Sequence, residues 1–288
     1  MAVTWKVTGS CPVCYTQTHR IFRVRGEFDI RECPKCRHRF AEWRPPADHV
    51  TTVYDDSYFF GGGAGYPDYL SEGRILREHG RRYGQLLRHY TAPGTMLDVG
   101  AAAGFICDGF RETGWQPEAL EPNPTMAAYG REKLGLAYHQ GALEDFACPR
   151  QYDLVSMIQV LAHFSNIRAA LHRAAEITRD GGFWLIETWN CRSLTARAFG
   201  KHWHEYNPPS VLHYFSAQSV DLLASQYGFE RVAGGHPGKR IMWRHARSLL
   251  DNQISAGWFH SLTGLIPDEM VLPYPSEDLL WAFFRKGK

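Results

Sequence analysis

The stretch LDVGAAAGF at residues 97–105 constrains the fold of this chain more than any other segment. Two apolar residues lead into an acid, and Gly100 and Gly104 then frame three alanines. We interpret the stretch as a buried strand that turns tightly into a helix. Short apolar strands and amphipathic helices alternate through the rest of the chain, which predicts an α/β fold with a mostly parallel sheet.

The hydrophobic pattern gives the expected order of strands and helices. An amphipathic helix is predicted over residues 68–90, and the sequence TAPG at 91–94 ends it. The expected strands are 95–100, 115–122, a segment within 152–164, 181–190 and 276–286. The expected helices between them are 105–114, 123–135, 166–178 and 216–229. Ligands of such sheets bind at the carboxyl ends of the first strands, so the glycine-rich turn lies at the expected binding site.

Glycine spacing and two acids decide which cofactor fits this turn. A phosphate-binding loop needs a lysine and a hydroxyl after its last glycine, and neither follows Gly104. A dinucleotide fingerprint has the spacing G-x-G-x-x-G, whereas this turn has G-x-x-x-G. Asp98 suits an ammonium group, and Glu121, at the end of the second strand, suits the two hydroxyls of a ribose. An ammonium group and a ribose without phosphates describe S-adenosylmethionine.

At these residues the chain resembles the class I S-adenosylmethionine-dependent methyltransferases, and the resemblance covers residues 91–288. It implies a Rossmann-like sheet with helices on both faces. The family usually has glycine where this chain has Ala102. Ala142 and Leu143 would flank the adenine, and Gln159 would face the cofactor. The cofactor-binding residues that the resemblance implies are Asp98, Gly100, Ala102, Gly104, Phe105, Glu121, Pro122, Ala142, Leu143 and Gln159.

Two cysteine pairs predict a second, smaller unit. CPVC and CPKC are separated by 18 residues, which fits a structural zinc site with four thiolate ligands. Residues 19–33 alternate apolar and polar side chains around Gly26 and predict a hairpin between the pairs. We therefore expect a zinc ribbon over residues 1–50. Its ligands are Cys11, Cys14, Cys33 and Cys36.

The whole layout also resembles a methyltransferase subgroup that has an N-terminal zinc ribbon and a Y-D-x-x-Y-F linker, here YDDSYF at 54–59. Such proteins occur in cell-surface polysaccharide and natural-product pathways. Glycine often follows each cysteine pair there, whereas this chain has Tyr15 and Arg37.

The remaining chain divides into a connecting segment and a domain with two insertions. Residues 51–93 are expected to form an aromatic, glycine-rich linker and a lid helix, and the glycine run at 61–65 leaves open whether the segment packs as a linker or orders over the cofactor. Residues 94–288 are expected to form the methyltransferase domain, with insertions at about 190–215 and 237–273. The second insertion has a basic face made of Arg240, Arg244, His245 and Arg247.

Methyl transfer to a hydroxyl or an acidic carbon requires a base. His163, just past the fourth strand, resembles the histidine of the V-L-E-H motif in quinone O-methyltransferases. Acids accompany that histidine and can bind a metal, whereas Gln159 and Ala162 stand at those positions here, so no catalytic metal is expected. His213 and Tyr214, in VLHYFS, are the rival catalytic residues.

Charge and hydropathy narrow the function. The formal net charge of +2 does not indicate a basic surface that would bind the phosphate backbone of a nucleic acid. Nucleic acid is therefore disfavoured as a partner. No apolar run approaches the roughly 20 residues of a membrane span, and the start lacks a signal-peptide pattern, so we expect a cytoplasmic protein. The leading hypothesis is a methyltransferase acting on a small molecule in natural-product or surface-sugar biosynthesis. The alternatives are an rRNA or tRNA methyltransferase and a noncatalytic binding protein with this fold; a homodimer is left open.

Overall fold

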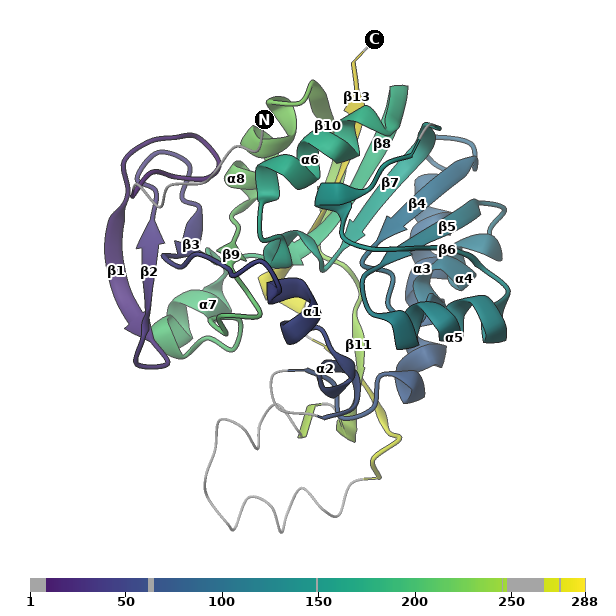
Figure 1. The fold of residues 1–288 in the computed structure, drawn as a ribbon, viewed down its shortest axis with the longest axis horizontal. Helices are drawn as coiled ribbons and strands as arrows, with labels where there is room; N and C mark the ends of the chain where they lie inside the picture. Colours follow the sequence, from purple (N-terminus) through teal and green to yellow (C-terminus); the bar gives the residue numbers. More distant parts are fainter. Residues whose placement is uncertain are drawn as a thin grey trace.

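A seven-stranded sheet forms the centre of the computed structural model, which describes residues 9–61, 65–148, 150–244, 246–247, 267–274 and 276–287 (Figure 1). The strand order is β10-β13-β8-β7-β4-β5-β6. The parallel strands are β4 (Thr95–Val99), β5 (Gln116–Glu121), β6 (Ala137–Gln140), β7 (Tyr152–Ile158) and β8 (Thr178–Trp189). β13 (Leu279–Lys286) runs antiparallel between β8 and β10 (Phe229–Gly235). This is the Rossmann-like α/β sheet that the sequence predicts.

Helices cover both faces of the sheet because successive strand residues point to opposite faces. Met96 and Leu154 pack with α3 (Gly73–Leu87) and α4 (Phe105–Arg111) on one face. Leu97 and Val155 pack with α6 (Ile167–Glu176) and α8 (Ala217–Ser225) on the other. α5 (Pro124–Leu134) packs beside β5 and β6. The helix predicted over 68–90 is a 3₁₀ turn, η1 (Leu70–Glu72), followed by α3.

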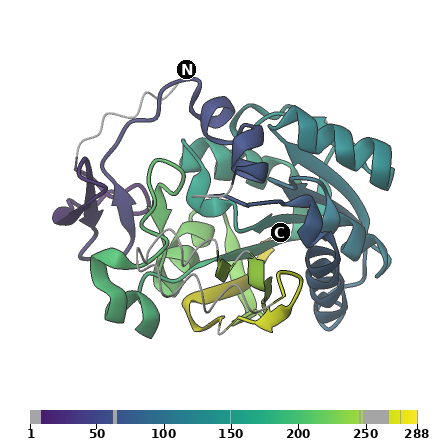
Figure 2. The ribbon, with the colours of Figure 1, turned by 90° about the horizontal axis from the view of Figure 1, so that it is seen from below.

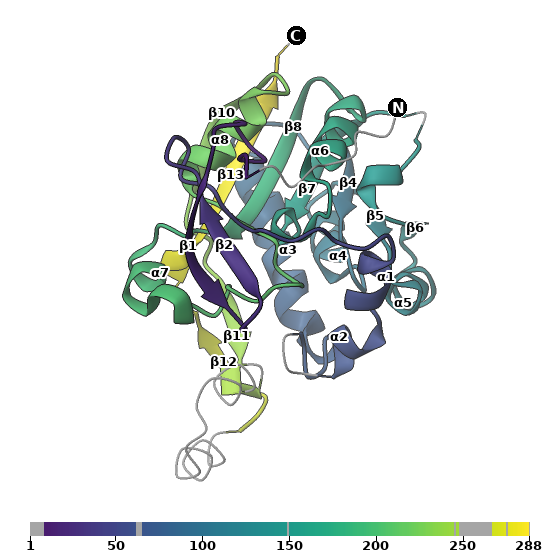
Figure 3. The ribbon, with the colours of Figure 1, turned by 60° about the vertical axis from the view of Figure 1, so that its left-hand side comes forward.

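The N-terminal ribbon is an antiparallel sheet that the main domain completes. β1 (His19–Val24) and β2 (Phe28–Glu32) form the predicted hairpin, and β3 (Arg39–Ala41) pairs with β2. The fourth strand, β9 (His213–Tyr214), comes from the first insertion and pairs with β3. The ribbon therefore lies beside α7 (Leu194–Phe199) and α8 (Figure 3).

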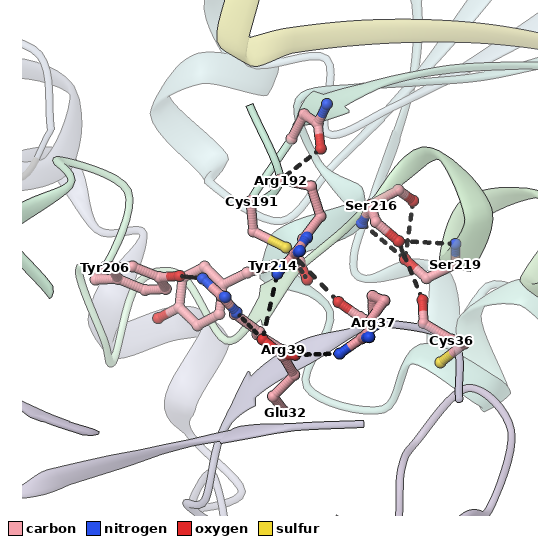
Figure 4. A network of polar contacts seen from close by, with 11 residues as sticks. Glu32, Cys36, Arg37, Arg39, Cys191, Arg192, Tyr206, Tyr214, Ser216 and Ser219 are labelled. Carbon is pink, nitrogen blue, oxygen red and sulfur yellow. Dashed lines mark hydrogen bonds and ion pairs between the residues drawn. The ribbon is translucent and has the colours of Figure 1, made fainter. Parts of the chain in front are cut away.

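Polar contacts join the ribbon to the main domain (Figure 4), and the two parts also share buried apolar residues. Arg39 donates to Glu32 at 2.6 Å and to the Tyr206 hydroxyl at 2.5 Å. The Ser216 hydroxyl, at the start of α8, donates to the Cys36 carbonyl at 3.1 Å. Three of the paired cysteines also belong to the buried cluster that includes α6 and α8. The ribbon and the main domain consequently share one hydrophobic core.

Short elements connect the two parts. α1 (His49–Val53) and α2 (Asp56–Phe60) follow the ribbon along the chain and lie beside the main domain (Figure 2). The first insertion holds α7, η4 (Gly200–His202) and β9, and the second holds the paired strands β11 (Arg240–Met242) and β12 (Val271–Pro273). Further 3₁₀ turns are η2 (Leu143–Asp145), η3 (Leu161–His163) and η5 (Ser276–Asp278).

Parts of several predicted features lie outside the described residues. These are residues 1–8 of the ribbon, residues 62–64 of the glycine run, His245 of the basic face and residues 248–266 of the second insertion. Within the described part of the chain, no helix has both the length and the apolar character needed to span a bilayer.

Candidate active site

The glycine-rich turn between β4 and α4 requires its two glycines. Gly100 and Gly104 have φ angles of 68° and 86°, in the left-handed region that side chains disfavour. A Cβ on Gly100 would lie 2.7 Å from a methyl group of Val160, and one on Gly104 would lie 2.5 Å from the Tyr138 hydroxyl. Neither position has room for a side chain, so the turn keeps its backbone close to the end of the sheet.

Ala102, where the family usually has glycine, also adopts a positive φ, of 47°. Its N–H donates to Glu121 Oε2 at 2.8 Å, and its carbonyl accepts from the Tyr138 hydroxyl at 2.8 Å. These two hydrogen bonds hold the alanine in a conformation that it adopts only at a cost.

Two buried acids end β4 and β5 on either side of this turn. Asp98 accepts from the Ser156 hydroxyl at 2.5 Å. Glu121 accepts from the backbone N–H of Ala102 and, at 2.9 Å, from that of Asn123. Burial raises the pKa of Asp98 to about 6 and that of Glu121 to about 7, because the charged carboxylates lose hydration.

A cavity opens over the carboxyl ends of β4, β5 and β7 and over the residues that follow β6. Most of the residues predicted to bind the cofactor line it; these are Asp98, Gly100, Ala102, Glu121, Pro122, Ala142, Leu143 and Gln159. His163 lines it as well. Gly104 and Phe105 do not, because Gly104 caps α4 and Phe105 is buried beneath the turn against Tyr69. These two residues shape the turn from below.

An aromatic wall closes one side of the cavity. It consists of Tyr54, Tyr58, Phe59, Tyr66 and Tyr69, from α2 and the residues around it. The Asn123 amide donates to the Tyr54 carbonyl at 3.0 Å and to Asp56 at 3.1 Å, which ties α2 to the end of β5. The segment that the sequence left open as a linker or a lid thus packs against the cavity.

His163 is held in one orientation at the edge of the cavity. Its Nδ1 lies 2.8 Å from the Ser210 carbonyl oxygen and 3.0 Å from the Tyr54 hydroxyl. A carbonyl only accepts, so Nδ1 carries the proton and Nε2 of the neutral ring keeps its lone pair. Burial lowers the pKa of His163, and the carbonyl groups of Ser210 and Gln159 only partly offset this. The ring is neutral at pH 7, with Nε2 as its basic nitrogen.

Comparison with known proteins identifies the family. The sequence profile of a family described as a methyltransferase domain matches residues 74–233, more than half of the chain. The chain belongs to this family. It therefore contains a class I S-adenosylmethionine-dependent methyltransferase domain, as the glycine-rich turn and its acids predicted.

Individual relatives agree with this assignment. A ubiquinone biosynthesis O-methyltransferase from Rhodopseudomonas palustris (strain BisB18) is 29% identical over 100 residues, which span 33% of this chain and 39% of the relative. The fold is similar to that of the 1,6-didemethyltoxoflavin-N1-methyltransferase of Burkholderia thailandensis, with a TM-score of 0.54 and 14% identity over 94% of this chain and all of that one. It is also similar to the magnesium protoporphyrin IX methyltransferase of Synechocystis PCC 6803, with a TM-score of 0.53 and 12% identity over 82% of this chain and all of that one.

The structure separates His213 and Tyr214 from the cavity. Both lie in β9, and neither lines the cavity. His213 Nδ1 lies 3.3 Å from Nε2 of His38 in the ribbon, and the Tyr214 hydroxyl donates to the Val211 carbonyl at 2.8 Å. Burial lowers the pKa of His213 to about 4. We therefore correct the sequence-based assignment: pairing with β3 turns this stretch into part of the ribbon, and His163 is the remaining candidate base of the original three.

A buried carboxylate that the sequence analysis missed ends β8. Glu187 accepts from His79 Nε2 at 2.8 Å, from Gln159 Nε2 at 2.6 Å and from the Tyr83 hydroxyl. Burial alone would raise the pKa of Glu187, but His79, Lys239 and the Tyr83 hydroxyl more than offset it and lower this pKa to about 2. Gln159, predicted to face the cofactor, is thus held between Glu187 and the Lys239 ammonium group, 3.2 Å away.

The four paired cysteines converge as predicted. Their sulfur atoms all lie within 4.8 Å of one another, with Cys11–Cys36 at 3.5 Å and Cys14–Cys33 at 3.4 Å. Zinc–sulfur bonds of about 2.3 Å in a tetrahedron place the sulfur atoms about 3.8 Å apart. Backbone N–H groups of Val13 and Cys36 also point at cluster sulfur atoms, at 3.4 and 3.5 Å. The cluster is consistent with a zinc ribbon.

Proposed function

We propose that this methyltransferase transfers the methyl group of S-adenosylmethionine to a small molecule and that His163 removes the proton of the acceptor. The observation that supports this proposal most is that Asp98, Glu121 and His163 line the same cavity. The name of the 29%-identical relative describes an O-methyltransferase of ubiquinone biosynthesis, which supports a small-molecule acceptor. The resemblance of the layout supports a role in natural-product or surface-sugar biosynthesis.

When bound, S-adenosylmethionine supplies a methyl group on a positively charged sulfur. Asp98 would accept a hydrogen bond from its ammonium group, and Glu121 would accept from its ribose hydroxyls, while Ala142 and Leu143 would flank the adenine. His163 Nε2 would take the acceptor proton while the methyl group passes to the acceptor atom and S-adenosylhomocysteine leaves as a neutral thioether. The Ser210 carbonyl accepts from Nδ1–H and stabilises the imidazolium that forms. The aromatic wall excludes water and orients the acceptor in line with the breaking bond.

Methyl transfer is tested by incubating the purified protein with S-adenosylmethionine and candidate hydroxy-, carbon- and amino-acceptors. We expect stoichiometric S-adenosylhomocysteine and methylated product with one acceptor class. Binding of the cofactor without transfer to any class would instead favour the noncatalytic binding protein, and transfer confined to RNA would favour the RNA methyltransferase.

Removing either acid is expected to weaken cofactor binding. Asp98→Ala and Glu121→Ala should each cost roughly 1–3 kcal/mol of binding free energy, the range for leaving a buried polar partner unmatched. Isothermal titration calorimetry with S-adenosylhomocysteine measures both. Glu118→Ala is the matched control, because Glu118 lies on β5 like Glu121 but pairs with Arg150 and does not line the cavity. Equal affinities in all variants would show that the acids do not contact the cofactor.

Cofactor affinity is also expected to rise with pH. The pKa values of Asp98 and Glu121, about 6 and about 7, lie above those of ordinary carboxyl groups, so both groups carry protons in mildly acidic solution. Accepting from the ammonium group and the ribose requires the charged form, so binding releases protons. The dissociation constant should therefore fall by up to about tenfold per pH unit for each proton released and level off above about pH 7. Calorimetry in two buffers of different ionisation enthalpy counts these protons; a dissociation constant that does not change with pH would contradict the assignment.

A further inference from the structure

Positive charge gathers at the β8 side of the cavity, away from Asp98. Lys239 and Arg240 follow β10, and Arg82 comes from α3; all three line the cavity. Lys239 Nζ lies 3.2 Å from the Gln159 amide oxygen and 4.9 Å from the centre of the Trp189 ring. One terminal nitrogen of Arg82 is buried and has no hydrogen-bond partner. Lys239 and Arg82 therefore have donors to spare.

The carboxyl groups near these cations balance their charge only in part, because Glu187 is the charged one beside Lys239. Among the described residues, neither Lys239 nor Arg82 has a carboxylate oxygen within 4.0 Å. Glu187 already accepts from three neighbours. Burial raises the pKa of Glu205, near Lys239, to about 8, which leaves that carboxyl group neutral at pH 7. This side of the cavity thus carries an excess of positive charge.

We infer that Lys239 and Arg82 bind an anionic group, a carboxylate or a phosphate, of the methyl acceptor. The inference rests on the proposed methyl transfer and names the substrate class for the same cavity. Partly desolvated cations are costly unless an anion balances them. The guanidinium fork and the ammonium group both suit carboxylate and phosphate oxygens. The facing wall of tyrosine rings suits an acceptor with a flat apolar body.

Anionic and neutral aromatic probes of similar size test this inference. The protein is saturated with S-adenosylhomocysteine, and 4-hydroxybenzoate and phenyl phosphate are each compared by calorimetry with the neutral 4-hydroxybenzamide. We expect at least one anion to bind about tenfold or more tightly than the amide, the scale of a charge-assisted hydrogen bond. Lys239→Met and Arg82→Gln should each abolish this preference, and Arg82→Lys should restore part of it.

Arg81→Gln is the matched control. Arg81 is the neighbour of Arg82 on α3, but it is exposed and pairs with Glu78, so we expect its loss to leave the preference intact. Binding of S-adenosylhomocysteine by every variant shows that the fold is retained. The inference is overturned if neither anion binds better than the amide, or if Arg81→Gln and Arg82→Gln act alike.

A second source of the anion is the carboxylate of the cofactor itself. If Lys239 and Arg82 hold that group, their variants lose affinity for S-adenosylhomocysteine and keep affinity for 5′-methylthioadenosine, which lacks the carboxylate, and the inference fails. Failure of the unaltered protein to bind S-adenosylhomocysteine would instead overturn the proposed methyl transfer.

Discussion

Replacing His163 with alanine is expected to lower kcat by about 10²–10⁴-fold, the usual contribution of a positioned general base. The affinity for S-adenosylmethionine should stay near normal, because proton removal matters only in the transition state. Burial lowers the pKa of His163, so the base is active at pH 7 and kcat should fall only when the solution becomes acidic enough to protonate it. Steady-state assays across pH at saturating cofactor measure kcat and its pH dependence. Saturation removes the contribution of Asp98 and Glu121 to cofactor binding from these measurements.

His163→Asn separates base chemistry from positioning. The asparagine amide can still donate to the Ser210 carbonyl, which accepts from His163 Nδ1 in the structure, but it has no basic nitrogen. If His163 is the base, the asparagine variant stays as slow as the alanine variant and loses the acidic limb of the pH profile. Recovery of the rate in the asparagine variant would show that His163 only positions its neighbours.

A loss of less than tenfold in both variants would contradict the need for a base. An amine that is already neutral at its nucleophilic nitrogen would then be the favoured acceptor, because such a nitrogen attacks before it loses a proton. The aromatic wall and the cationic side of the cavity do not depend on this outcome.

The central strands were predictable because their environment is uniform. β4, β7 and β8 are covered by helices on both faces, so they appear in the sequence as nearly continuous apolar runs. β10 was not predicted. It lies at the edge of the sheet, most of its residues are exposed, and it ends in two glycines, so it carries no apolar alternation. β9 has only two residues, and its partner strand lies far away along the chain.

The cofactor side of the site could be predicted more fully than the acceptor side. The glycine-rich turn and Asp98 lie within nine consecutive residues, so their geometry follows from local sequence. Glu187, His79 and Lys239 come from a strand, a helix and an insertion, and only the order of the strands brings them together. The one local sign was an acid inside the apolar run WLIETW. His213 illustrates the opposite error. A motif resemblance placed this residue at the cavity, but its strand, β9, pairs with strand β3 of the ribbon.

Loss of the proposed zinc ion is expected to destabilise the whole chain. The purified protein should contain about one zinc per chain, and Cys33→Ser should abolish it. Structural zinc sites in small domains contribute roughly 10–16 kcal/mol of binding free energy at pH 7, which is comparable with the stability of an entire domain. We therefore expect the variant to be largely insoluble or unfolded at 37 °C, as measured by metal analysis and circular dichroism.

The shared core determines how the loss of zinc affects the stability of the main domain. The Val13 carbonyl, between two cluster cysteines, accepts from Arg168 of α6 at 2.9 Å and from Gln226 at the end of α8 at 2.8 Å. Because these helices cover one face of the main sheet, removing zinc with a chelator should lower the melting temperature of a single cooperative transition. Cys148→Ser is the matched control, since Cys148 lies outside the cluster and should leave both the zinc content and the melting temperature unchanged. A zinc-free protein that remains fully stable would refute the metal site, and a ribbon that unfolds alone while cofactor affinity persists would refute the shared core.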